Sequence, residues 1–132
     1  METKTRYAPG AELFIPETLM EAFADLGDGA YDNESSSSGL VVGERFSDTR
    51  GVWTELTGIS GDESLTGAVG WFRTSEGNGI EMSAADIRRH KGLFGKERAY
   101  AIMIDPSASS LVFYTVEDDI PVRVRAMVME GR

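Results

Sequence analysis

Residues 70–86, GWFRTSEGNGIEMSAAD, form the stretch that decides how the rest of the chain is interpreted. Its apolar start is typical of the end of a buried strand, and its Gly-, Ser- and Asn-containing centre predicts a loop. Ser83, followed three residues later by Asp86, is a variant of the capping box that opens a helix. A strand end that faces a helix N-terminus is a common place for a site, so this stretch is the first functional candidate.

Apolar runs on both sides of this stretch predict a β-sheet. Strands are expected at residues 12–15, 39–43, 52–59, 65–72, 100–104, 111–116 and 122–128. The purely apolar run at 39–43 predicts a strand buried on both faces. The alternation of apolar and polar residues at 122–128 predicts a strand with one solvent-exposed face.

Two helices are expected between these strands. The first begins at Pro16, carries Leu19 and Phe23 at helical spacing, and ends at Gly27. The second runs from Ser83 to about residue 91, with Gly92 breaking the pattern. Residues 1–10 are predicted to be a loose arm, and 27–38, which include four consecutive Ser, a mobile loop. The order of elements predicts one α/β (α+β) domain over residues 1–132.

The composition is that of an ordinary globular chain, with 41% hydrophobic and 27% charged residues among 132. No apolar run approaches the roughly 20 residues that span a bilayer, and no secretory signal is visible. The absence of Cys excludes disulfides, thiolate zinc sites and cysteine nucleophiles. We therefore expect a cytoplasmic protein that does not bind membranes.

The net charge of −9 argues against a nucleic-acid binder. The charge is uneven, because residues 1–82 carry 5 Lys/Arg against 15 Asp/Glu, whereas residues 83–132 carry 8 against 7. The acidic half either faces a basic partner or is a surface that keeps the protein soluble.

The frame of residues 70–86 resembles the core motif of the JAMM/MPN (Mov34-type) metalloproteases. In that family a Gly-Trp strand end leads into His-x-His, then a loop, then Ser-x-x-Asp at the start of a helix. Gly70-Trp71 and Ser83-x-x-Asp86 match this frame. The resemblance extends over about residues 12–116, through Gly39-x-x-x-Gly43 and Ile104-Asp105-Pro106. It implies a curved mixed β-sheet that carries two or three helices.

The resemblance also implies that the catalytic residues of the family are lost. Arg73 and Ser75 stand where the two zinc-binding His are expected, and Ser36 stands where the catalytic Glu is expected. Glu34 lies two residues before that position and would be displaced by roughly 6–7 Å along a strand. The vestigial site therefore consists of Ser36, Arg73, Ser75, Ser83 and Asp86, with no zinc and no other cofactor expected.

Asp86 needs a positive partner if it lies in a sheltered cleft. In the family geometry the side chains at both positions converge on one point. We therefore predict an Arg73–Asp86 ion pair, which can form in bidentate geometry. The alternative is that Arg73 turns to solvent and Asp86 only caps its own helix.

Two further features have a structural and a functional interpretation. His90, the single His, follows Asp86 by one helical turn and is interpreted as a surface residue rather than a metal ligand. A basic patch is interpreted as a solvated helix face, the alternative being contact with an acidic partner or phosphate. This patch consists of Arg88, Arg89, Lys91, Lys96 and Arg98.

The resemblance leads to a hypothesis of a non-catalytic interaction or scaffold domain. Its partner would be a protein, or an extended peptide held by strand addition. The candidate partners are a ubiquitin-like protein and an active JAMM relative. The alternative is a metal-dependent isopeptidase- or peptidase-like hydrolase with a site rebuilt from Asp86, Glu76, Glu81 and His90. A third hypothesis is a small homodimeric scaffold.

Overall fold

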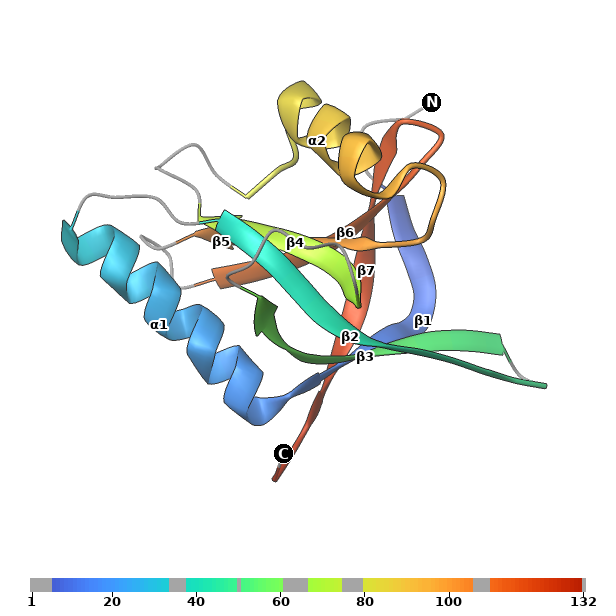
Figure 1. Cartoon of the computed structure of the whole chain (residues 1–132), viewed down its shortest axis with the longest axis horizontal. Coiled ribbons are helices and arrows are strands. Elements are labelled where there is room, and N and C mark those ends of the chain that lie inside the picture. Colours follow the sequence, from blue (N-terminus) through green and yellow to red (C-terminus); the bar gives the residue numbers. More distant parts are fainter. Residues whose placement is uncertain are drawn as a thin grey trace.

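The computed structural model describes residues 6–33, 38–49, 51–60, 67–74, 80–105 and 110–131 (Figure 1). In chain order its elements are β1 (Arg6–Pro16), α1 (Glu17–Asn33), β2 (Ser38–Asp48), β3 (Gly51–Ser60), β4 (Ala68–Thr74), α2 (Ala84–Phe94), β5 (Tyr100–Asp105), β6 (Ser110–Glu117) and β7 (Ile120–Met129). Each of the seven strand predictions overlaps a strand, and six of these strands are longer than predicted. The fourth, predicted at 65–72, is β4, which begins at Ala68; residues 65 and 66 lie outside the described residues.

The strands form one mixed sheet that closes on itself in the order β1-β3-β2-β4-β5-β6-β7. β1 runs parallel to both β7 and β3, and β4 runs parallel to β5, whereas the other neighbours are antiparallel. The contact between β1 and β3 is short and pairs Leu13 with Thr54 and Phe14 with Glu55. The curved mixed sheet with two described helices confirms the fold class expected from the sequence.

The two helices cover different faces of this sheet, as Figure 1 shows. Leu19 and Phe23 of α1 pack into the first core cluster with inward residues such as Ile102. Phe94 of α2 packs into the second cluster with Trp71 and other outward residues of the neighbouring strands. The central strands are therefore buried on both faces, which explains why residues 100–104 form a continuous apolar run.

Two glycines allow the strands to approach closely. A Cβ at Gly70 would lie 2.5 Å from the carbonyl oxygen of Tyr100, so a side chain there would push β4 away from β5. A Cβ at Gly43 would lie 2.4 Å from the carbonyl oxygen of Glu55, at the register shift between β2 and β3. Gly43 thus permits the bulge at which the hairpin bends.

The predicted end of the first helix is wrong, because α1 continues through Gly27 to Asn33. A Gly inside a helix costs only about 1 kcal/mol relative to Ala, and the buried face of Leu19 and Phe23 supports the helix. Residues 27–33 of the predicted loop are thus helical, residues 34–37 lie outside the described residues, and Ser38 begins β2.

The predicted loose arm at 1–10 is also wrong where it can be compared. Residues 6–10 belong to β1, in which Arg6 pairs with Val122 and Tyr7 with Arg123. The ladder with β7 satisfies backbone groups that a free arm would leave to water. Residues 1–5 lie outside the described residues.

The second helix passes Gly92 and ends at Phe94, three residues later than predicted. Phe94 is buried, and Gly95 caps the helix with φ 59° and a backbone bond to the carbonyl oxygen of Lys91. Neither helix in the described part of the chain is long and apolar enough to cross a membrane.

Candidate functional site

The candidate site lies where β4 ends and α2 begins. Arg73 is the penultimate residue of β4, and Ser83 is the N-cap of α2. The Ser83 side chain accepts a 3.1 Å hydrogen bond from the backbone N–H of Asp86, whose carboxylate accepts a 2.8 Å bond from the backbone N–H of Ser83. The capping box expected from the sequence is therefore present.

Arg73 and Asp86 form the bidentate ion pair predicted from the sequence. Arg73 Nε donates to Asp86 Oδ1 at 2.8 Å, and Nη2 donates to Oδ2 at 2.7 Å. Nη2 also lies 3.4 Å from the carbonyl oxygen of Glu81, which accepts a further bond. These two parallel bonds, called the Arg73–Asp86 fork below, connect the end of the strand to the start of the helix. Each Asp86 oxygen thus accepts at least one hydrogen bond.

These contacts also set the ionisation of Asp86. Burial by itself would raise the pKa of this carboxyl, but the hydrogen bonds from Arg73 and Ser83 and the charge of Arg73 outweigh it and lower the pKa. The carboxylate is therefore held in its ionised form beside a permanent cation.

The interpretation of His90 as a surface residue is wrong. His90 is 2% exposed, and its Nδ1 accepts a 3.1 Å hydrogen bond from Nε1 of the fully buried Trp71. Burial lowers its pKa to about 4, so the ring is neutral and carries its proton on Nε2. Asp86, His90 and Phe94 are the buried residues of α2, and their spacing of four residues places them on one face.

Only some of the expected site residues can be placed. Ser36, Ser75, Glu34 and Glu76 lie outside the described residues, and Glu81 is exposed. Within the described ranges, no group of three or more His, Cys, Asp or Glu side chains is arranged to hold a metal ion. Of the residues that the hydrolase alternative names, Asp86, Glu81 and His90 are described, and they do not form such a group.

The basic patch is divided among separate contacts rather than forming one cationic surface. The Arg89 guanidinium lies 4.8 Å from the ring centroid of Trp71 and covers it. Lys91 pairs with Asp119 at 2.6 Å, while Arg88 and Lys96 are exposed. Arg98 belongs to a network that sequence reasoning missed.

That network joins three distant segments of the chain. Arg98 forms a fork on Glu12 of β1 and donates to Glu117 at 2.7 Å, and the Tyr100 hydroxyl donates to Glu12 at 2.7 Å. Burial opposes ionisation of Glu12, but the bonds from Arg98 and Tyr100 and the charge of Arg98 lower its pKa. Burial, followed by the contact with Glu12, raises the pKa of Tyr100 to about 12.

A cavity of about 660 Å³ adjoins this network. It is lined by the end of α2, residues 95–98 and the turn between β6 and β7. Lysines and an arginine alternate there with carboxylates, and two ion pairs, Lys91–Asp119 and Arg98–Glu117, neutralise much of its wall. Its charges therefore favour neither an anion nor a cation.

Solved structures share this architecture. The solution structure of a protein from Desulfitobacterium hafniense has a TM-score of 0.63 and 15% identity, covering 90% of this chain and 94% of that chain. A structure described as a JAMM metalloprotease-like zinc site in the proteasome and signalosome has a TM-score of 0.60 and 14% identity, with 89% and 98% covered. A JAB1/MPN domain protein from Archaeoglobus fulgidus has a TM-score of 0.59 and 16% identity, with 92% and 100% covered.

These similarities establish that the chain has a JAMM/MPN-like fold. No family model matches the sequence, and no curated protein matches it. At 14–16% identity the likeness concerns the fold, and the function has to be argued from the residues of this chain.

The zinc implied by this fold class does not fit the described residues. Asp86, to which the sequence resemblance assigns a ligand position, already binds Arg73 through both oxygens and Ser83 through one of them. The guanidinium of Arg73 places a fixed positive charge against this carboxylate, where a divalent cation would have to approach. His90 presents Nδ1 to Trp71 inside the core and not to Asp86.

Proposed function

We propose that this chain is a non-catalytic JAMM/MPN-like domain that acts through contacts with a partner protein. The observation that carries the proposal is the Arg73–Asp86 fork, at the two positions where the resemblance expects zinc ligands. A catalytic zinc needs three protein ligands and one open position, and a general base has to accept the proton of the bound water. The carboxylate that remains is instead used by an internal ion pair.

The closed sheet favours contact through side chains over strand addition. Strand addition requires a sheet edge with unpaired backbone groups. Each described strand has a neighbour on both sides over part of its length, although β3 pairs with β1 only at Thr54 and Glu55, and β2 pairs with β4 only as far as Val42. A partner would therefore recognise the surface of the sheet or the projecting hairpin.

The non-catalytic part of the proposal is tested by metal analysis of the purified chain and by incubation with an isopeptide-linked ubiquitin-like substrate. We expect no stoichiometric zinc and no cleavage. One zinc per chain, with turnover that Asp86→Ala abolishes, would overturn the proposal in favour of the hydrolase alternative.

The matched variant Arg73→His/Ser75→His restores the two imidazoles of the family frame. We expect it to take up zinc together with Asp86, because its donors are those zinc prefers. Uptake by this variant but not by the natural chain would identify the two lost ligands as the reason for the difference.

The interaction part is tested in the native cell by crosslinking the tagged chain and identifying bound proteins by mass spectrometry. Light scattering of the purified chain separates a partner from self-association. A chain that forms a stable homodimer and captures no other protein would favour the homodimeric scaffold.

A further inference from the structure

The β2–β3 hairpin projects from the body of the sheet, away from both helices, as Figure 1 shows. Thr54 and Leu56 of β3 are buried toward the barrel interior, so the alternating residues Trp53 and Glu55 lie on the outer face. The outer face of this hairpin, formed by Glu44, Phe46, Trp53 and Glu55, is called the hairpin face below.

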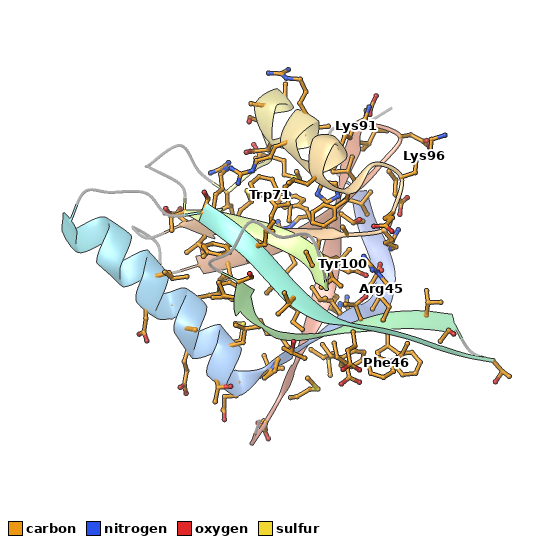
Figure 2. All side chains as sticks on the ribbon, in the orientation of Figure 1. Arg45, Phe46, Trp71, Lys91, Lys96 and Tyr100 are labelled. Carbon is orange, nitrogen blue, oxygen red and sulfur yellow. The ribbon has the colours of Figure 1, made fainter. Side chains whose placement is uncertain are left out.

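An aromatic pair forms half of the hairpin face. Phe46 of β2 is directly opposite Trp53 of β3, and the two rings stack with centroids 5.5 Å apart and planes inclined by 15°. Both side chains are partly exposed. Figure 2 shows Phe46 and its neighbour Arg45 on opposite sides of the hairpin, with Phe46 directed away from the core.

Two carboxylates form the other half. Glu44 is directly opposite Glu55, and Trp53 Nε1 donates a 3.2 Å hydrogen bond to Glu55 Oε2. Like charges directly opposite each other in an antiparallel pair destabilise the fold. The described residues of β2 and β3 include a single cation, Arg45, and it is bonded to the carbonyl oxygen of Arg98 on the inner side. No cation of these two strands compensates the two carboxylates.

This combination has the chemistry of a site for cationic side chains. A Lys or Arg stem packs against exposed aromatic rings, its charge is attracted to the ring face, and two adjacent carboxylates accept its N–H groups. A second copy of this chain would fit poorly, because a two-fold contact through the hairpin face would bring four carboxylates together.

We propose that the hairpin face docks an Arg- or Lys-bearing segment of a partner protein. The proposal deepens the function proposed above and rests on it, since it names the surface and the chemistry of the partner. The strong negative balance of residues 1–82 would attract the same segment at longer range.

The two tryptophans give a direct test by NMR. Their indole N–H signals report on different regions, because Trp53 lies on the hairpin face and Trp71 is fully buried against His90. The full chain is titrated with an alternating Leu/Arg hexapeptide amide, with alternating Leu/Gln and Leu/Glu peptides as controls. We expect a saturable shift of the Trp53 signal with the Leu/Arg peptide alone and no change of the Trp71 signal.

Variants separate the hairpin face from the overall charge. Glu44→Gln/Glu55→Gln should weaken binding of the Leu/Arg peptide about tenfold and should be at least as stable as the natural chain, because it removes a like-charge pair. Glu21→Gln/Glu130→Gln changes the net charge equally at exposed positions elsewhere and should leave binding unchanged. Val52→Thr alters a highly exposed residue of the same strand on its other face and should also leave it unchanged.

Three results would overturn the proposal: no saturable Trp53 shift, an equal shift with the Leu/Gln peptide, or equal loss of binding in the two charge variants. A Trp53 signal that changes with dilution of the chain alone would instead identify a second copy as the occupant. The zinc and cleavage assays do not depend on this face, so either proposal can fail while the other stands.

Discussion

The Arg73–Asp86 fork and the Arg98–Glu12 fork use the same chemistry over very different separations. The first joins residues 13 apart, and the second joins residues 86 apart. The side chains of the first pair are 23% and 10% exposed, and those of the second are 38% and 17% exposed. The first fork thus depends on two well-shielded groups, whereas the second is more exposed and shares Arg98 and Glu12 with Glu117 and Tyr100.

The largest effect is expected for Asp86→Ala. It removes the fork and the carboxylate half of the capping box, and it leaves Arg73 without its anionic partner. Breaking a shielded ion pair on one side costs about 3–5 kcal/mol of unfolding free energy. Urea unfolding measures this, with Ser83→Ala as the control for the cap alone at about 1 kcal/mol. Equal losses in the two variants would mean that the fork adds nothing beyond the cap.

The pH dependence of stability should distinguish the surroundings of the Arg73–Asp86 fork from those of the Arg98–Glu12 fork. His90, next to the first fork on α2, has a folded pKa of about 4, below its ordinary 6.5. Between these values the unfolded chain binds a proton that the folded chain does not, so stability falls as the pH drops through this window. The loss of unfolding free energy across this window is on the order of 3 kcal/mol.

The carboxylates of both forks act at lower pH. The folded pKa values of Asp86 and Glu12 are lowered, so their contribution is present above the unfolded pKa and is lost as the pH falls through the folded one. His90→Gln keeps an acceptor for Trp71 and should remove the step between pH 6.5 and 4 while leaving the acid step. A variant with an unchanged upper step would show that His90 is not its origin.

Double-mutant cycles compare the forks directly. The cycle of Arg73→Met with Asp86→Asn should give a coupling of about 1–3 kcal/mol, because both groups are well shielded. The cycle of Arg98→Met with Glu12→Gln should give about 1 kcal/mol or less, because Arg98 is more exposed and has a second partner. A larger coupling in the Arg98 cycle would reverse the comparison.

The difference between the forks also explains what the sequence could and could not predict. Arg73 and Asp86 flank one predicted strand–loop–helix unit, so their meeting follows from local structure. Glu12 and Arg98 meet because β1 pairs with both β7 and β3 to close the barrel, and no local pattern specifies that pairing.

The missed role of His90 had a signal in the sequence. Asp86, His90 and Phe94 repeat every four residues, so burying Phe94 also buries His90. A helix that ends before Gly92 leaves Phe94 outside it, and the pattern is then hidden. The same assumption shortened the first helix at Gly27, and in both cases packing of an apolar face outweighs the cost of one Gly.

The smallest effect is expected for the second described ion pair with a partner on α2, Lys91–Asp119. Its atoms are as close as those of the forks, at 2.6 Å, but its side chains are 53% and 66% exposed. Water screens the two charges, and holding two exposed side chains in one geometry costs conformational entropy. Both effects should reduce the coupling energy of the pair to less than about 0.5 kcal/mol. The cycle of Lys91→Met with Asp119→Asn measures this coupling.

Asn is chosen at position 119 so that the cycle measures the ion pair without a change in the backbone free energy of the turn. Asp119 has φ 64° and follows Asp118 at φ 52°, a left-handed turn that Asn adopts as readily as Asp. Asp119→Ala would instead lose about 1 kcal/mol through the backbone, whatever the ion pair contributes. We therefore expect Asp119→Ala to destabilise the turn and Asp119→Asn to leave it unchanged. Adding Lys91→Met should not alter the change in unfolding free energy caused by either substitution. A coupling in the Lys91 cycle as large as that of the Arg98 fork would show that distance, and not shielding from water, sets the strength of these pairs.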